Sequence, residues 1–239
     1  MVSKKKPLGI SLTELNKIEP ITENQKEVFA SYSKGQNLFL YGVAGTGKTF
    51  VALYNALKDV LDPKSPRERV YIVRSLLPTR DIGFLPGDEE DKSYLYQVPY
   101  QNMVRFMFKR GSDAEFDRLY NDLRNQGTID FLTTSFLRGV TIDNGVVIVD
   151  ECQNLNFHEL DTIMTRVGQD TKIVFAGDMQ QTDLTKSQDR NGILSFVNIL
   201  QEMQEMECIE FGLNDIVRSG LIKSYLINKI KLGLHYEQI

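Results

Sequence analysis

The segment at positions 42–49 constrains the fold of this chain more than any other part of it. The residues before it, 37–41, have the apolar composition of a buried strand, and the residues after it, up to position 61, have helical spacing. A strand that runs into a helix through the pattern G-x-x-x-x-G-K-[ST] is typical of a loop that binds the phosphates of a nucleotide. Here the pattern reads Gly42-Val43-Ala44-Gly45-Thr46-Gly47-Lys48-Thr49.

The residue types of this segment predict how each position acts. Its glycines let the backbone turn with its N–H groups toward a polyanion, and the N-terminus of the following helix adds a partial positive charge. Lys48 supplies a full charge for the β- and γ-phosphates, and the Thr49 hydroxyl is a Mg²⁺ ligand. We therefore predict ATP and Mg²⁺ as ligands, with the nucleotide contacts running from Gly42 to Phe50.

Short apolar runs and segments of helical spacing alternate along the rest of the chain. The predicted strands are 37–41, 69–74, 129–133, 145–149, 172–176 and 208–211, and the predicted helices are 48–61, 100–109, 113–126, 157–167, 191–203 and 215–231. This alternation predicts an α/β fold with a mostly parallel sheet and helices on both faces. Region 75–99 contains several prolines and glycines, so we expect no long helix or strand there.

Carboxylates follow the most apolar of the predicted strands. Asp150 and Glu151 come directly after 146–149, at the end of the sheet where ligands of such folds bind. We assign Asp150, with Thr49, to the metal, and Glu151 to the activation of the attacking water. Gln181, beside Asp178 after another strand, is the predicted γ-phosphate sensor, the alternative being an ordinary polar turn.

Composition and charge limit the number of domains, the partners and the location that we expect. We expect a single domain over 1–239, with 1–18 as a flexible N-terminal extension. The net charge of −4 means that any contact with nucleic acid is local. No stretch of about 20 apolar residues is present, so no membrane partner is expected. Cys152 and Cys208 lack metal or disulfide spacing, and the expected location is the cytoplasm.

Seven pieces of the sequence, in this order, resemble the PhoH-like ATPase family, which is similar to the first motor domain of superfamily 1 helicases. The resemblance covers about 19–225 and implies a RecA-like P-loop NTPase fold. The pieces are 20–25 (PITENQ), 42–49, 83–88 (GFLPGD), 138–139 (RG), 150–154 (DECQN), 177–184 (GDMQQTDL) and 215–219 (DIVRS).

The resemblance also implies roles for residues outside the loop. Gln25 corresponds to a glutamine that reads the adenine edge, the alternative being an exposed residue at a helix start. Segment 83–88 corresponds to a loop near the nucleic-acid face, although a plain surface loop explains it too. Arg218 corresponds to an arginine that meets the γ-phosphate, from the same chain or from a neighbouring subunit; an ordinary surface cation is the alternative. Arg138 is a second candidate for an arginine that contacts the nucleotide site of a neighbouring subunit.

Two hypotheses for the function follow. The first is an ATPase that acts on RNA or single-stranded DNA as a homo-oligomer, with a hexameric ring as one form of it. The second is an ATP-dependent switch that changes its affinity for a partner and does no work on nucleic acid. A small-molecule kinase uses the same loop, but adjacent Asp and Glu suit water activation, so we rank the kinase last.

Overall fold

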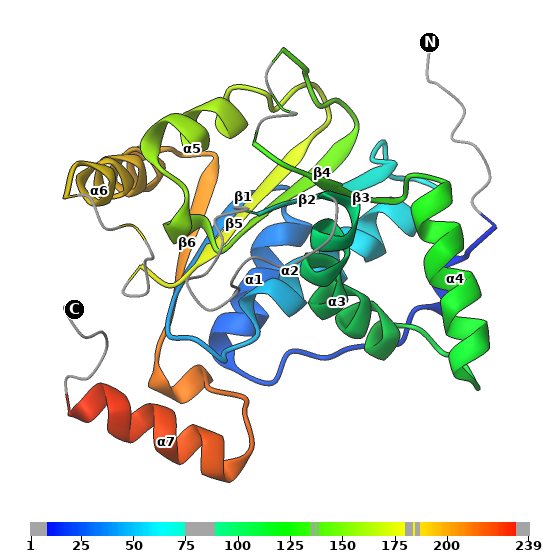
Figure 1. Cartoon of the computed structure of the whole chain (residues 1–239), viewed down its shortest axis with the longest axis horizontal. Helices are drawn as coiled ribbons and strands as arrows, with labels where there is room; N and C mark the ends of the chain where they lie inside the picture. Colours follow the sequence, from blue (N-terminus) through cyan, green and yellow to red (C-terminus); the bar gives the residue numbers. More distant parts are fainter. Residues whose placement is uncertain are drawn as a thin grey trace.

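The structure is a computed structural model that describes residues 9–74, 89–134, 137, 139–179, 184 and 187–232. The described strands are β1 (Asn37–Gly42), β2 (Arg69–Arg74), β3 (Ile129–Leu132), β4 (Gly145–Asp150), β5 (Lys172–Gly177) and β6 (Met206–Phe211). They form one sheet in the order β3-β2-β4-β5-β1-β6, and every pair is parallel (Figure 1). The predicted α/β class with a parallel sheet is confirmed.

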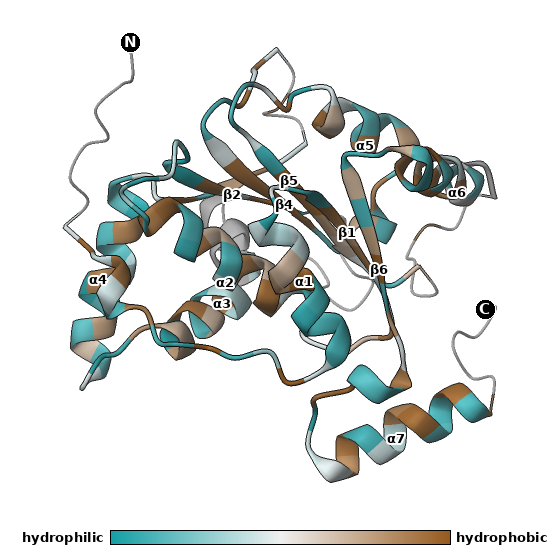
Figure 2. Ribbon diagram, turned by 180° about the vertical axis from the view of Figure 1, so that it is seen from behind, coloured by the Kyte–Doolittle hydropathy of each residue, from teal (hydrophilic) through white to brown (hydrophobic). Residues whose placement is uncertain are grey.

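Helices cover both faces of this sheet. One face packs against α1 (Glu23–Ser33), α2 (Lys48–Leu61), α3 (Glu89–Met107) and α4 (Asp113–Asn125), and the other packs against α5 (Phe157–Met164) and α6 (Ser187–Glu202). Side chains alternate between these two cores, so Leu38 and Leu40 face one and Phe39 faces the other. Figure 2 shows the central strands as the most hydrophobic part of the molecule.

The last helix, α7 (Gly220–Lys231), lies away from the sheet and buries none of its residues (Figures 1 and 2). It starts later than the predicted 215, because residues Leu213–Asp215 form a separate 3-10 turn. Among the described helices, none combines the length and the apolar character that crossing a membrane requires.

The prediction that 75–99 contains no long helix is wrong from residue 89 onward. Helix α3 runs from Glu89 through Pro99, which has no N–H to donate to the carbonyl four residues earlier. The turns after the proline compensate, because Tyr100, Val104 and Met107 are buried in the core beside α2. Tertiary packing therefore outweighs the loss of one helical hydrogen bond.

The start of the chain packs more closely than the sequence suggests. The sequence predicts a flexible extension over 1–18, of which residues 1–8 lie outside the described residues. Within 9–18, Ile10 and Leu15 are buried, and Asn16 N–H donates to the Met107 carbonyl (2.7 Å). Helix α1, which the apolar pattern did not reveal, follows at Glu23 with the Thr22 hydroxyl as its N-cap. The N-terminal segment and α1 thus complete one side of the core.

Candidate nucleotide-binding site

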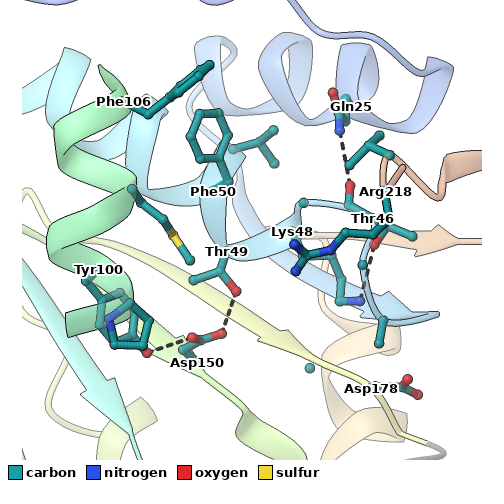
Figure 3. A pocket seen from close by; sticks show the side chains of 18 of the residues that line it. Gln25, Thr46, Lys48, Thr49, Phe50, Tyr100, Phe106, Asp150, Asp178 and Arg218 are labelled. Atoms are coloured by element: carbon teal, nitrogen blue, oxygen red, sulfur yellow. Dashed lines mark hydrogen bonds between the residues drawn. The ribbon is translucent and has the colours of Figure 1, made fainter. Parts of the chain in front are cut away.

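A pocket of about 810 Å³ lies where the carboxyl ends of β1, β4 and β5 meet. The loop of residues 42–49 between β1 and α2, here called the phosphate-type loop, lines the centre of this pocket. Asp150 and Glu151 enter the pocket from the end of β4, and Asp178 enters it from the end of β5. Figure 3 shows Lys48 and Thr49 of the loop with Asp150 and Asp178, which come from separate elements. Binding at the carboxyl edge is the position expected for an open parallel α/β sheet.

The loop has the backbone that its glycines predict. Gly42, Gly45 and Gly47 adopt φ values of 111°, 78° and 82°, in the left-handed region that disfavours side chains. A Cβ on Gly42 would lie 2.3 Å from the carbonyl oxygen of Phe211 in β6, so the start of the loop also requires glycine for space. The loop is therefore fixed both by conformation and by close contact with the sheet.

Lys48 extends into the loop that precedes it. Its Nζ donates to the carbonyls of Gly42 and Val43, at 2.8 Å each, and to the Thr46 hydroxyl at 3.4 Å. Burial lowers the pKa of Lys48, and the nearby Asp178, Glu151 and Asp150 carboxylates oppose that shift. The ammonium lies inside the curve of the loop, which is where the β- and γ-phosphates of a nucleotide bind in loops of this type.

Thr49 and Asp150 meet as the sequence predicts for a metal site. The Thr49 hydroxyl donates to Asp150 Oδ1 at 2.7 Å, and Asp150 as a residue is only 7% exposed. Burial raises the pKa of Asp150, the charge of Glu151 adds to the rise, and hydrogen bonds from Tyr100 and Thr49 oppose it. A hydroxyl beside one carboxylate fits Mg²⁺, which at phosphate sites takes oxygen ligands from one or two carboxylates and from the substrate.

Tyr100 is a functional candidate that sequence reasoning missed. Its hydroxyl donates to Asp150 Oδ2 at 2.6 Å, so both carboxylate oxygens accept a hydroxyl (Figure 3). The residue belongs to α3, and its apolar spacing in the sequence indicates a core position, with no motif around it. Its contact with Asp150 depends on how α3 packs against the sheet, which the sequence does not reveal.

Glu151 is held by a second residue of the same turn. Glu151 adopts φ 50°, and its Oε2 accepts a hydrogen bond from Gln153 Nε2 at 2.6 Å. The other end of that amide, Gln153 Oε1, accepts the Asp178 N–H at 3.1 Å. A Cβ on Gly177 would lie 2.5 Å from the same oxygen, so the glycine makes room for this bridge between the ends of β4 and β5.

Gln25 is buried rather than exposed, so it is no ordinary helix-start residue. The side chain is 5% exposed, its Nε2 donates to the Thr46 carbonyl at 3.1 Å, and its Oε1 accepts the Ile21 N–H at 3.0 Å. Both ends of the amide are therefore bonded within the protein, and one of them is bonded to the phosphate-type loop itself (Figure 3).

The segment before α7 contacts the loop in the same chain. Val217 N–H donates to the Gly45 carbonyl at 3.1 Å, and Arg218 Cγ lies 3.1 Å from the position of a Cβ on Gly45. Arg218 lines the same pocket as Lys48, and both side chains are labelled in Figure 3. The structure thus brings Arg218 to the loop without a neighbouring subunit.

The remaining predicted residues either lie outside the described residues or line the pocket. Gln181, Arg138 and segment 83–88 lie outside the described residues. Phe50 lines the pocket at the start of α2, where it pairs with Phe106 of α3, a residue that the sequence analysis did not select.

Comparison with known proteins finds one matching family and several similar proteins. The family model described as "PhoH-like protein" matches residues 17–229. Protein PhoH2 of Bacillus subtilis is 35% identical over 66% of this chain and 35% of its own length, and a PhoH-like protein of Mycobacterium leprae is 30% identical over 90% and 59%, respectively. The chain therefore spans between about a third and three fifths of the curated relatives that it matches.

Solved structures resemble the chain more distantly. Bacteroides Pif1 bound to single-stranded DNA covers 90% of this chain with 17% identity and a TM-score of 0.39, over 46% of that protein. The Pif1 helicase from Candida albicans gives 15% identity and a TM-score of 0.38, over 81% of this chain and 40% of that one.

The parallel sheet, the loop after β1 and the family match all fit a P-loop protein. The predicted RecA-like P-loop NTPase fold is confirmed, and a nucleotide is the ligand class that such a fold binds. The chain belongs to the PhoH-like protein family.

Proposed function

We propose that this chain binds ATP with Mg²⁺ in the pocket and hydrolyses it to ADP and phosphate. The observation that carries this proposal is the 2.7 Å hydrogen bond between Thr49 and Asp150, which brings together the end of the loop and the end of β4. Glu151 follows at the next position, at the edge of the same pocket. A metal ligand pair beside a second carboxylate is the arrangement that hydrolysis by water requires.

Each side chain then has a chemical role. Thr49 and Asp150 would hold Mg²⁺, which would neutralise charge on the phosphates. Lys48 neutralises the negative charge of the phosphates from inside the loop. Arg218, just before α7, adds a second positive charge. Glu151, oriented by Gln153, positions the attacking water and accepts its proton. Gln181 remains our expected sensor of the γ-phosphate.

Two variants test this division of roles. Lys48→Ala removes the cation of the loop, so Mg-ATP binding is lost in titration calorimetry. Glu151→Gln keeps shape but not charge, so binding persists while phosphate release falls by roughly 10²-fold or more. Lys58→Ala, an exposed lysine on α2, is the control and changes neither quantity. Equal loss of binding in the Lys48 and Glu151 variants would contradict the role of Glu151.

We further propose that hydrolysis is coupled to RNA or single-stranded DNA, in a cytoplasmic homo-oligomer. The family resemblance supports the coupling and the oligomer. Because Arg218 reaches the loop of its own chain, the oligomer is not needed to supply that arginine. The test is phosphate release with and without single-stranded RNA or DNA at low salt, run beside native mass measurements. Stimulation supports the coupling, whereas its absence leaves the second hypothesis, an ATP-dependent switch.

A further inference from the structure

Three positively charged side chains line the pocket among the residues that the structure describes: Lys48, Arg74 and Arg218. Lys48 lies inside the phosphate-type loop, and Arg218 lies against that loop at Gly45. Arg74 is the last residue of β2, which β4 and β5 separate from β1 in the sheet. It therefore enters the pocket from the side opposite to Arg218, whose segment follows β6 at the other end of the strand order.

Arg74 and the proposed metal ligand Asp150 are neighbours on one face of the sheet. Strands β2 and β4 pair in parallel, and Arg74 is directly opposite Asp150 in their register. Side chains alternate along each strand, and Ile72 and Ile148, two positions earlier, both face the core that contains α2. Arg74 therefore shares with Asp150 the face from which Thr49 contacts this carboxylate (Figure 3).

The Arg74 guanidinium has no bonded partner in the described part of the chain. The residue is half-buried, and none of the described residues forms a hydrogen bond or an ion pair with this side chain. Burial raises the pKa of Asp150 and Glu151 adds to the rise, whereas the positive charge of Arg74 is among the effects that oppose it. Because charges removed from water are normally paired, this position suits an anionic group of a bound ligand.

The terminal phosphate of a nucleotide is the anion that would reach this position. The phosphates would enter the loop after β1, and a metal ion at Thr49 and Asp150 would bridge the β- and γ-phosphates of a triphosphate. The phosphate chain would therefore run from the loop toward the end of β4. Arg74, on the next strand beyond β4, would lie beside its γ end, and a diphosphate would stop short of it.

We propose that Arg74 binds the γ-phosphate, so that it favours ATP over ADP and stabilises the charge of the γ-phosphate during hydrolysis. This inference rests on the proposed function, because it places the phosphates in the loop and Mg²⁺ between Thr49 and Asp150. The planar guanidinium can donate two parallel hydrogen bonds to phosphate oxygens, which an ammonium cannot do. Lys48 and Arg218 approach the loop that holds both nucleotides, whereas Arg74 meets only the phosphate that ADP lacks.

The test measures the binding of ADP and of the non-hydrolysable analogue β,γ-imido-ATP, both with Mg²⁺, by titration calorimetry. Arg74→Met keeps the apolar stem and removes the charge, so the affinity for β,γ-imido-ATP falls by about 10–100-fold and that for ADP by less than about twofold. Arg74→Lys keeps a charge without the planar fork and loses less. Arg69→Met is the matched control, because this exposed arginine begins the same strand at the opposite edge of the sheet and changes neither affinity.

Two results overturn the inference. An equal loss of both affinities in Arg74→Met would show that the arginine acts through Asp150 and the metal, which ADP and the analogue share. Unchanged affinities for both, with or without weaker binding of single-stranded DNA, would remove Arg74 from the nucleotide site. If Arg74→Met does not fold, Arg74→Lys decides in its place: a loss confined to β,γ-imido-ATP supports the inference, and an equal loss or none overturns it.

The proposed function fails in a different way. If Arg74→Met loses affinity only for the triphosphate, but the wild type releases no phosphate from ATP under any condition, hydrolysis is refuted while the contact with the γ-phosphate stands. If the wild type binds neither nucleotide, both proposals fall together.

Discussion

Replacing Tyr100 with phenylalanine removes one hydroxyl and leaves the ring in the core. The residue is 2% exposed, its ring packs against Phe131 with centroids 5.4 Å apart, and Phe retains this contact. What is lost is the 2.6 Å hydrogen bond to Asp150 Oδ2. The variant therefore isolates one interaction with a buried carboxylate.

A hydrogen bond to a charged group contributes about 1.5–3 kcal/mol to stability, and the burial of both partners favours the upper half of that range. For a chain of this size, 1 kcal/mol shifts the melting temperature by roughly 2–4 °C, so we expect a decrease of about 5–12 °C. Far-UV circular dichroism measures the transition, since the chain has no tryptophan to report it.

The same variant should affect metal-dependent binding. Tyr100 fixes the orientation of Asp150, and groups that orient a metal ligand contribute about 10–100-fold to metal affinity. We therefore expect the affinity for ADP to fall about tenfold in the presence of Mg²⁺ and to change little in its absence.

Tyr32→Phe is the matched control. The Tyr32 hydroxyl donates to Asp59 Oδ2 at 3.0 Å, a pair in which the tyrosine is buried and the carboxylate partly buried, and neither residue lines the pocket. This control should lose stability but keep its Mg-ADP affinity. The reasoning is refuted if Tyr100→Phe melts within about 1 °C of the wild type, or if both variants weaken Mg-ADP binding equally.

Three further outcomes are expected. Gly42→Ala should lose about 3 kcal/mol or more in urea unfolding, because the new Cβ meets the Phe211 backbone at a positive φ; a loss below 1 kcal/mol would contradict this. Gln153→Leu should keep Mg-ADP affinity but slow phosphate release about tenfold, since Glu151 loses its orienting amide; unchanged release would remove that role. Burial lowers the pKa of Lys172 to about 8, below its ordinary value of 10.5, so the folded state binds fewer protons than the unfolded state between these values. Stability should therefore rise by about 1–2 kcal/mol across that window, and Lys172→Met should flatten the profile.

Local patterns were enough to predict the elements that build the site. Helix α2 has the predicted bounds, because a glycine ends the loop and apolar spacing continues to Leu61. Strand β4 is buried along its whole length, as its unbroken apolar run indicates. The contact between Thr49 and Asp150 follows from the position of both residues at the same edge of a parallel sheet.

Contacts made by packing between distant segments could not be predicted in this way. Tyr100 reaches Asp150 only because α3 continues through Pro99 and lies against the sheet. Gln25 is buried because α1 sits over the loop, although its sequence has weak amphipathic character. In both cases the deciding partner is far away in the chain, and propensity or spacing carries no information about it.

The neighbours of β1 have a consequence for synthesis. Leu38 pairs with Val174 on one side and with Glu207 on the other, so the strand that leads into the loop has no partner close to it in sequence. Such distant pairing slows folding, because the chain between the partners must be ordered first. Most of the domain must therefore leave the ribosome before β5 and β6 can pair with β1. A fragment that ends before β6 would lack one of the two strands that hold β1, and the loop after it, in place.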